Sequence, residues 1–121
     1  QNIFDLFPKK IAYFSKNKNL ALIENINEKF SLSGFVHNPE RNFTKSLKNN
    51  SSGFVQGNFP SESLAKPNVD FKKDFELFCK RMKRVEIEER LNWVCSLNHG
   101  VLPKTPEENV KYFINHIREK F

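Results

Sequence analysis

The chain has 121 residues, a length that suits one domain with a single hydrophobic core. It carries 20 lysines and arginines against 14 aspartates and glutamates, so its net charge is +6 and its pI about 9.4. This excess favours a polyanionic partner, such as nucleic acid or an acidic protein surface, although a need for solubility accounts for it equally well. Thirteen phenylalanines argue against disorder. The apolar runs are too short to span a membrane, and no secretory leader is visible.

The first expected elements lie before residue 31. Residues 2–7 have the pattern of a short helix that Pro8 ends. The apolar runs at 11–14 and 20–23 flank five polar residues, which predicts a β-hairpin. The alternative is one amphipathic helix, but the polar residues would interrupt its apolar stripe. Residues 27–30 have the pattern of a helix start.

Two copies of Ser-Gly-Phe-Val, at residues 33–36 and 52–55, are each compatible with a short strand or with a helix exit at glycine. Between them, residues 38–41 have the pattern of a helix start, and Phe43 and Leu47 are expected to face the core of that helix.

The region that follows, residues 57–69, contains two prolines and is expected to be an exposed connector.

The last third predicts two helices, from Asp70 to about Asn98 and from Thr105 to the end. The first helix carries two apolar stripes on opposite sides, so it either kinks near residues 86–89 or packs against two bodies. The second helix is expected to pack antiparallel on the later stripe. The earlier stripe consists of Phe71, Phe75, Phe78, Met82 and Val85, and the later one of Ile87, Leu91, Val94 and Cys95.

The two cysteines, Cys79 and Cys95, are both expected on the first of these helices. A rise of about 1.5 Å per residue would separate them by about 24 Å, far beyond the reach of a disulfide. We therefore expect free thiols and an intracellular location, in the cytoplasm or the nucleus.

A family resemblance enters at residues 18–25, Lys-Asn-Leu-Ala-Leu-Ile-Glu-Asn, which resemble the core octamer of the RNA recognition motif. Lys18, Ala21 and Ile23 match the pattern, and leucines stand at two aromatic positions. The resemblance implies an open sheet on which single-stranded bases stack, with Tyr13 or Phe14 as the platform. The alternative is that both rings belong to the core.

Basic side chains give the second part of the expected nucleic-acid surface. Most of those on the helix from Asp70 fall opposite the phenylalanine stripe, where they could follow a phosphate backbone or form a solvated face. The residues we expect to contact nucleic acid are Tyr13, Phe14, Lys16, Lys18, Lys73, Lys80, Lys83 and Arg84.

Catalytic and metal sites find little support in the sequence. Cys95 and His99 have helical ligand spacing, but His116 is expected too far along the second helix, and structural zinc needs four ligands. Residues 34–38 resemble a segment of acylphosphatases, yet no arginine precedes Arg41 to form that family's phosphate loop. We therefore expect no metal, no cofactor and no enzymatic activity.

Together these patterns predict one α+β domain, with a small antiparallel sheet and a C-terminal pair of packed helices. Residues 1–56 form an α/β part, 57–69 a connector and 70–121 a helical hairpin. An all-α fold is the alternative. The expected function is a non-enzymatic module that binds single-stranded RNA or another nucleic acid. The alternative is a protein-interaction module of a larger assembly. The sequence leaves open the oligomeric state and whether the chain is a fragment.

Overall fold

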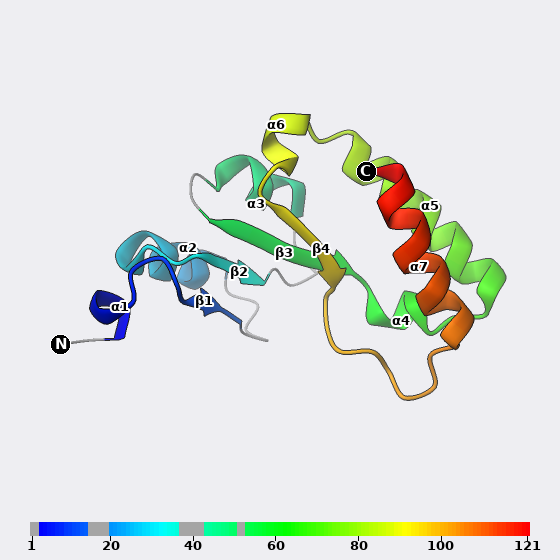
Figure 1. Ribbon diagram of the computed structural model, residues 1–121. Helices are drawn as coiled ribbons and strands as arrows, with labels where there is room; N and C mark the ends of the chain where they lie inside the picture. Colours follow the sequence, from blue (N-terminus) through cyan, green and yellow to red (C-terminus); the bar gives the residue numbers. More distant parts are fainter. Residues whose placement is uncertain (1–2, 15–19, 37–42, 51–52) are drawn as a thin grey trace.

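The computed structural model describes residues 3–14, 20–36, 43–50 and 53–121, in which strands alternate with helices (Figure 1). The strands are β1 (Ala12–Tyr13), β2 (Gly34–Val36), β3 (Phe54–Phe59) and β4 (Trp93–Leu97). The helices are α1 (Ile3–Leu6), α2 (Leu20–Phe30), α3 (Phe43–Asn49), α4 (Ser61–Leu64), α5 (Asn68–Lys83), α6 (Ile87–Arg90) and α7 (Glu107–Lys120). This alternation is typical of an α/β fold.

The four strands form one sheet in the order β1-β2-β3-β4, and every pairing is parallel. Parallel neighbours need a crossover connection, which α2 supplies between β1 and β2, α3 between β2 and β3, and α4 to α6 between β3 and β4. The predicted antiparallel sheet is therefore wrong, and so is the all-α alternative. The fold class is α/β.

The predicted hairpin fails at its second apolar run. Residues 20–23 begin α2 rather than a strand, and β1 pairs with β2, where Tyr13 lies opposite Phe35. Leucine, alanine and glutamate are strong helix formers, and they dominate the start of α2. Residues 27–30, expected to start a helix, form its last turn. The short N-terminal helix is confirmed as α1.

Residues 34–36 of the first Ser-Gly-Phe-Val copy and residues 54–55 of the second lie in the neighbouring strands β2 and β3, which confirms the strand interpretation for both. They pair out of step by one residue, since Gly34 lies opposite Phe54 and Phe35 opposite Val55. The missing side chain of Gly34 is required at this point, because a Cβ atom there would overlap the Phe54 ring. The expected start of the helix between the copies, at residues 38–41, lies outside the described residues. Phe43 and Leu47 of α3 are buried, as predicted.

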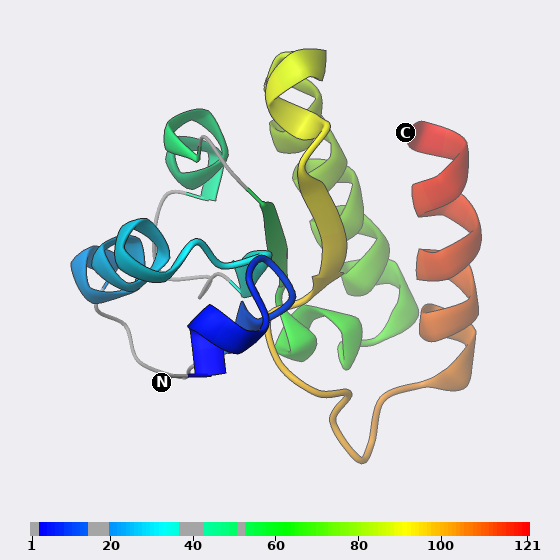
Figure 2. The ribbon, with the colours of Figure 1, turned by 60° about the vertical axis from the view of Figure 1, so that its left-hand side comes forward.

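The core lies between β3 and β4 on one side and α5 and α7 on the other (Figure 2). Phe59 of β3 is fully buried and lies against Phe71 and Phe75 of α5 and Phe113 of α7. On the opposite face of the same strands, Val94 is 42% exposed. Parallel sheets are normally covered on both faces, so this open face is an unusual feature of the chain.

The last third departs from prediction after residue 83. The first apolar stripe is confirmed, because its five members are at most 3% exposed. However, α5 ends at Lys83, and residues 93–97 form a strand rather than more helix. Ile87 and Leu91 of the later stripe are 66% and 76% exposed, and α7 packs on α5 instead. The prediction that the later stripe forms one face of a helix is wrong, because its members belong to α6, a turn and β4.

Residues 57–69 contain the end of β3 and all of α4, with Phe59 and Ser61 fully buried. The division of the chain into a single domain with three parts stays a prediction. No helix in the described part of the chain is both long and apolar enough to cross a lipid bilayer.

Candidate functional site

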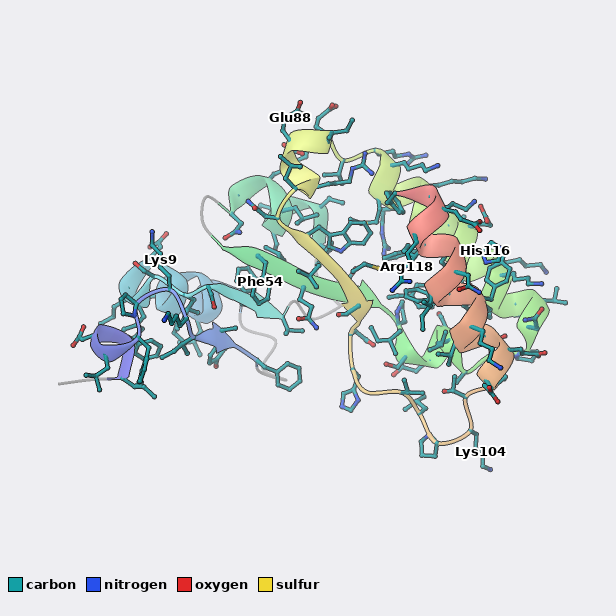
Figure 3. The ribbon with its side chains drawn as sticks, in the orientation of Figure 1. Lys9, Phe54, Glu88, Lys104, His116 and Arg118 are labelled. Atoms are coloured by element: carbon teal, nitrogen blue, oxygen red, sulfur yellow. The ribbon has the colours of Figure 1, made fainter. Side chains whose placement is uncertain are left out.

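A cavity of about 330 Å³ lies at the carboxyl ends of all four strands. The residue after β1 and side chains of the other three strands contribute to it, because parallel strands end at the same edge of a sheet, which is where α/β proteins commonly bind ligands. In Figure 3 the loop that carries Lys104 leaves the carboxyl end of β4, whereas Glu88 of α6 lies beyond the opposite end of that strand. The lining residues are Phe14, Val36, Gln56, Ser96, Leu97, Asn98, His99, Gly100 and Val101.

Backbone and side-chain hydrogen bonds fix the β4 end of the cavity. The Asn98 N–H donates to the Phe59 carbonyl at 2.9 Å, which continues the β3–β4 ladder one residue past the strand. At the amino end of β4, away from the cavity, Trp93 Nε1 donates to the Gly57 carbonyl at 2.7 Å. Because Asn98 is held in this way, its neighbour His99 leaves the sheet from a fixed position at the rim.

The cavity combines apolar walls with few polar groups. Phe14, Val36 and Leu97 supply hydrocarbon, whereas Gln56 and Ser96 supply neutral hydrogen-bonding groups. Among the described lining residues, His99 has the only ionisable side chain, and it is exposed. A site of this kind suits a largely apolar ligand with polar substituents, to which the imidazole nitrogens of the histidine can form hydrogen bonds.

The predicted binding residues do not gather in one place. Phe14 is 60% exposed and lines the cavity, whereas Tyr13 is half-buried against the core. Lys16 and Lys18 lie outside the described residues. The remaining basic residues are exposed on α5 and at its C-terminal end, and none lines the cavity. They are Lys73, Lys80, Lys83 and Arg84. Nothing tests contact between these side chains and nucleic acid, which stays a prediction.

The cysteines lie on different elements, Cys79 on α5 and Cys95 on β4, and both are free thiols, as predicted. The expected separation along one helix is wrong, because both side chains belong to the same core region. Burial raises the pKa of Cys79 to about 11 and that of Cys95 to about 12. Such thiols are poor nucleophiles at neutral pH. Within the described residues, no group of three His, Cys, Asp or Glu side chains could hold a metal ion.

The sequence does contain a signal for this site. An apolar run at 93–97 is followed directly by Asn98, His99 and Gly100, as expected of a buried strand that ends at a functional edge. The helical spacing of the later apolar stripe favoured a helix for the same run. In a helix His99 has only the metal-ligand spacing to Cys95, so its place at the end of a strand was not predicted.

Comparison with known proteins decides the family. The family model for uroporphyrinogen decarboxylase matches residues 1–120, almost the whole chain. The chain belongs to the uroporphyrinogen decarboxylase family. A curated relative, the uroporphyrinogen decarboxylase of Rickettsia bellii (strain RML369-C), is 46% identical over 37 residues. That match covers 31% of this chain and only 11% of the relative.

Membership in the uroporphyrinogen decarboxylase family agrees with the parallel sheet, since the family fold is a TIM barrel. In such a barrel one face of every strand points inward and the active site lies at the carboxyl ends. The open face of β3 and β4 and the position of the cavity both fit this arrangement.

The family match corrects several expectations. The resemblance of residues 18–25 to the RNA recognition motif does not mark membership of that family, because short aliphatic and basic segments recur in unrelated folds. The expected non-enzymatic RNA-binding module is wrong, as is the alternative of a protein-interaction module, since the family is one of enzymes. RNA is likewise wrong as the expected partner.

Proposed function

We propose that this chain is part of a uroporphyrinogen decarboxylase, and that the cavity at the carboxyl ends of β1 to β4 belongs to the substrate site. The observation that carries the proposal is the position of this cavity in a chain that matches the family over residues 1–120. The activity and substrate are proposed for the whole natural protein that contains these residues, because the aligned relative is matched over 11% of its length.

The chemistry assigns a role to His99. Decarboxylation breaks a C–C bond, releases CO₂ and leaves an electron pair on carbon that must take up a proton. A histidine can supply that proton or hold the carboxylate substituent in position, and His99 is the only ionisable side chain among the described lining residues. The apolar walls formed by Phe14, Val36 and Leu97 suit the hydrocarbon of a tetrapyrrole macrocycle.

A cytoplasmic location belongs to the same proposal and is supported by the free thiols of Cys79 and Cys95. The nucleus, the other expected location, finds no support in the family match.

The test is a decarboxylation assay on the full natural protein, with uroporphyrinogen as substrate and the loss of carboxylate groups as the readout. We expect His99→Gln to lower kcat/KM by about 10²- to 10⁴-fold, as for the loss of a group that transfers protons. His116→Gln is the matched control, because His116 lies on α7 and does not line the cavity (Figure 3). Its ring stacks on that of Tyr112, with the two centroids 3.7 Å apart. A wild-type protein without activity would contradict the proposed function, and an active His99→Gln variant would contradict only the role of His99.

A further inference from the structure

Three hydrogen bonds hold Asn98 at the carboxyl end of β4, where it lines the cavity. Its backbone N–H donates to the Phe59 carbonyl, and its Oδ1 accepts from both the backbone N–H and the hydroxyl of Ser61. The bonds therefore join the end of β4 both to the end of β3 and to the start of α4. Backbone and side chain of Asn98 are fixed together.

Helix α4 depends on the same contact. The first N–H groups of a helix have no partner within it, and the residue that precedes α4 is Pro60, whose side chain makes no capping hydrogen bond. The N–H of Ser61, the first residue of α4, finds its acceptor in Asn98 instead. Ser61 is fully buried, so a displaced Asn98 would leave two buried donors unpaired. The fold therefore resists any movement of Asn98.

His99 has no comparable hold of its own. Its side chain is exposed, and its imidazole has no hydrogen-bond partner within the described residues. The residue that follows, Gly100, is not confined by neighbours, because a Cβ atom built there would meet nothing within 4 Å. Glycine is also the most permissive residue in its backbone angles. Of the two residues bonded to His99, only Asn98 fixes its place in the fold.

We infer that Asn98 is a positioning residue that acts through His99, an inference that rests on the proposed function. A group that transfers a proton must lie within hydrogen-bond reach of the reacting atom. A misplacement of about 1 Å can cost about 10²-fold in rate, even when the substituted residue does not touch the reacting atoms. The contact between Asn98 and Ser61 holds the imidazole of His99 at the rim of the cavity in this way.

The experiment measures kcat and KM separately for the decarboxylation of uroporphyrinogen by the full natural protein. For Asn98→Ala we expect kcat to fall by about 10- to 100-fold with little change in KM. Asn109→Leu is the matched control, because Asn109 is also a buried, hydrogen-bonded asparagine but lies on α7 and does not line the cavity. Assayed well below its unfolding temperature, this variant should keep the wild-type kcat.

A double-mutant cycle with His99→Gln separates positioning from the other roles open to Asn98. If Asn98 acts through His99, Asn98→Ala should lower kcat little further in the His99→Gln protein. The same fold loss in both backgrounds would make Asn98 a substrate contact or a structural residue only, and would overturn the inference. An unchanged kcat in Asn98→Ala, or an equal loss in Asn109→Leu, would overturn it as well.

Two further results complete the test. If Asn98→Ala does not fold, Ser61→Ala, which removes only the hydroxyl bond, replaces it, with a smaller loss of kcat that again disappears in the His99→Gln background. A wild-type protein without decarboxylase activity would overturn the proposed function together with this inference. An active wild type with an equally active His99→Gln variant would overturn the inference and leave the proposed function intact.

Discussion

Asn98 Oδ1 accepts two hydrogen bonds from Ser61, one from its backbone N–H at 2.8 Å and one from its hydroxyl at 3.0 Å. Ser61 begins α4 just after β3, and Asn98 directly follows β4. The pair therefore joins the carboxyl ends of two neighbouring strands. Because His99 is the next residue, this contact also sets where the loop at the cavity begins.

Asn98→Ala is expected to destabilise the fold more than Ser61→Ala. The first change leaves both donors of a fully buried serine without a partner and should lower the free energy of unfolding by about 1–3 kcal/mol. The second removes only the hydroxyl bond and should cost about 0.5–1.5 kcal/mol. Urea denaturation of the two variants measures both values, and a reversed order would contradict the arrangement.

Asn109 is expected to be the most sensitive polar residue of α7. It is fully buried, its Nδ2 donates to the carbonyls of Leu64 and Lys66 at 2.9 and 2.8 Å, and its Oδ1 accepts from Asn68 at 2.8 Å. Asn109→Leu leaves these three groups unpaired, so we expect a loss of about 2–4 kcal/mol in thermal or urea unfolding. Asn115→Leu, at an exposed position of the same helix, should change stability by less than about 0.5 kcal/mol. Similar effects of the two variants would refute a bridging role for Asn109.

Phe59 is expected to be the apolar residue whose truncation costs most. Its ring centroid lies 5.1 to 6.3 Å from four others, and the residue is fully buried. The partners are Phe71, Phe75, Phe78 and Phe113. Phe59→Ala should lower the free energy of unfolding by about 3–5 kcal/mol, as measured by calorimetry or urea denaturation. The space left by the missing ring cannot close, because a sheet and two helices surround it. Phe7→Ala, at a position 51% exposed, serves as the control and should cost less than about 0.5 kcal/mol.

The two thiols should resist alkylation in the native protein. Burial raises the pKa of Cys79 and Cys95 from an ordinary 9.0 to about 11 and about 12, which leaves little thiolate at pH 8. Iodoacetamide labelling followed by mass spectrometry should therefore be slow in buffer and fast in urea, and rapid native labelling would contradict the buried positions.

The same pKa shifts predict how stability depends on pH. Because the folded state favours the neutral thiols, their contribution is complete below pH 9 and is lost as pH rises toward 11 and 12. Substitution of both cysteines by alanine should therefore reduce the loss of stability between pH 9 and 11, as measured by urea denaturation at each pH. An unchanged pH dependence in the double variant would contradict this assignment.

Only some residues of the candidate site could be predicted from the sequence. The sequence pointed to Phe14, although for RNA stacking, and the structure places it at the cavity. It did not point to a common site for His99, Gln56 and Val36, because they come from segments that only the sheet brings together. The partner of a parallel strand is distant in the chain, so no local pattern identifies it.

The sequence by itself determined the elements whose pattern is local. The buried stripe of α5, the short helix α1 and the helix after Pro106 follow from apolar spacing, proline positions and charge at the helix ends. Only the tertiary structure decided that residues 20–23 are helical and that residues 93–97 form a strand. Short apolar runs are compatible with either state, and the decision comes from the neighbour that buries them. For residues 93–97 that neighbour is β3, which forms the backbone hydrogen bonds of the strand pair. In the sequence, β3 is separated from these residues by α4, α5 and α6.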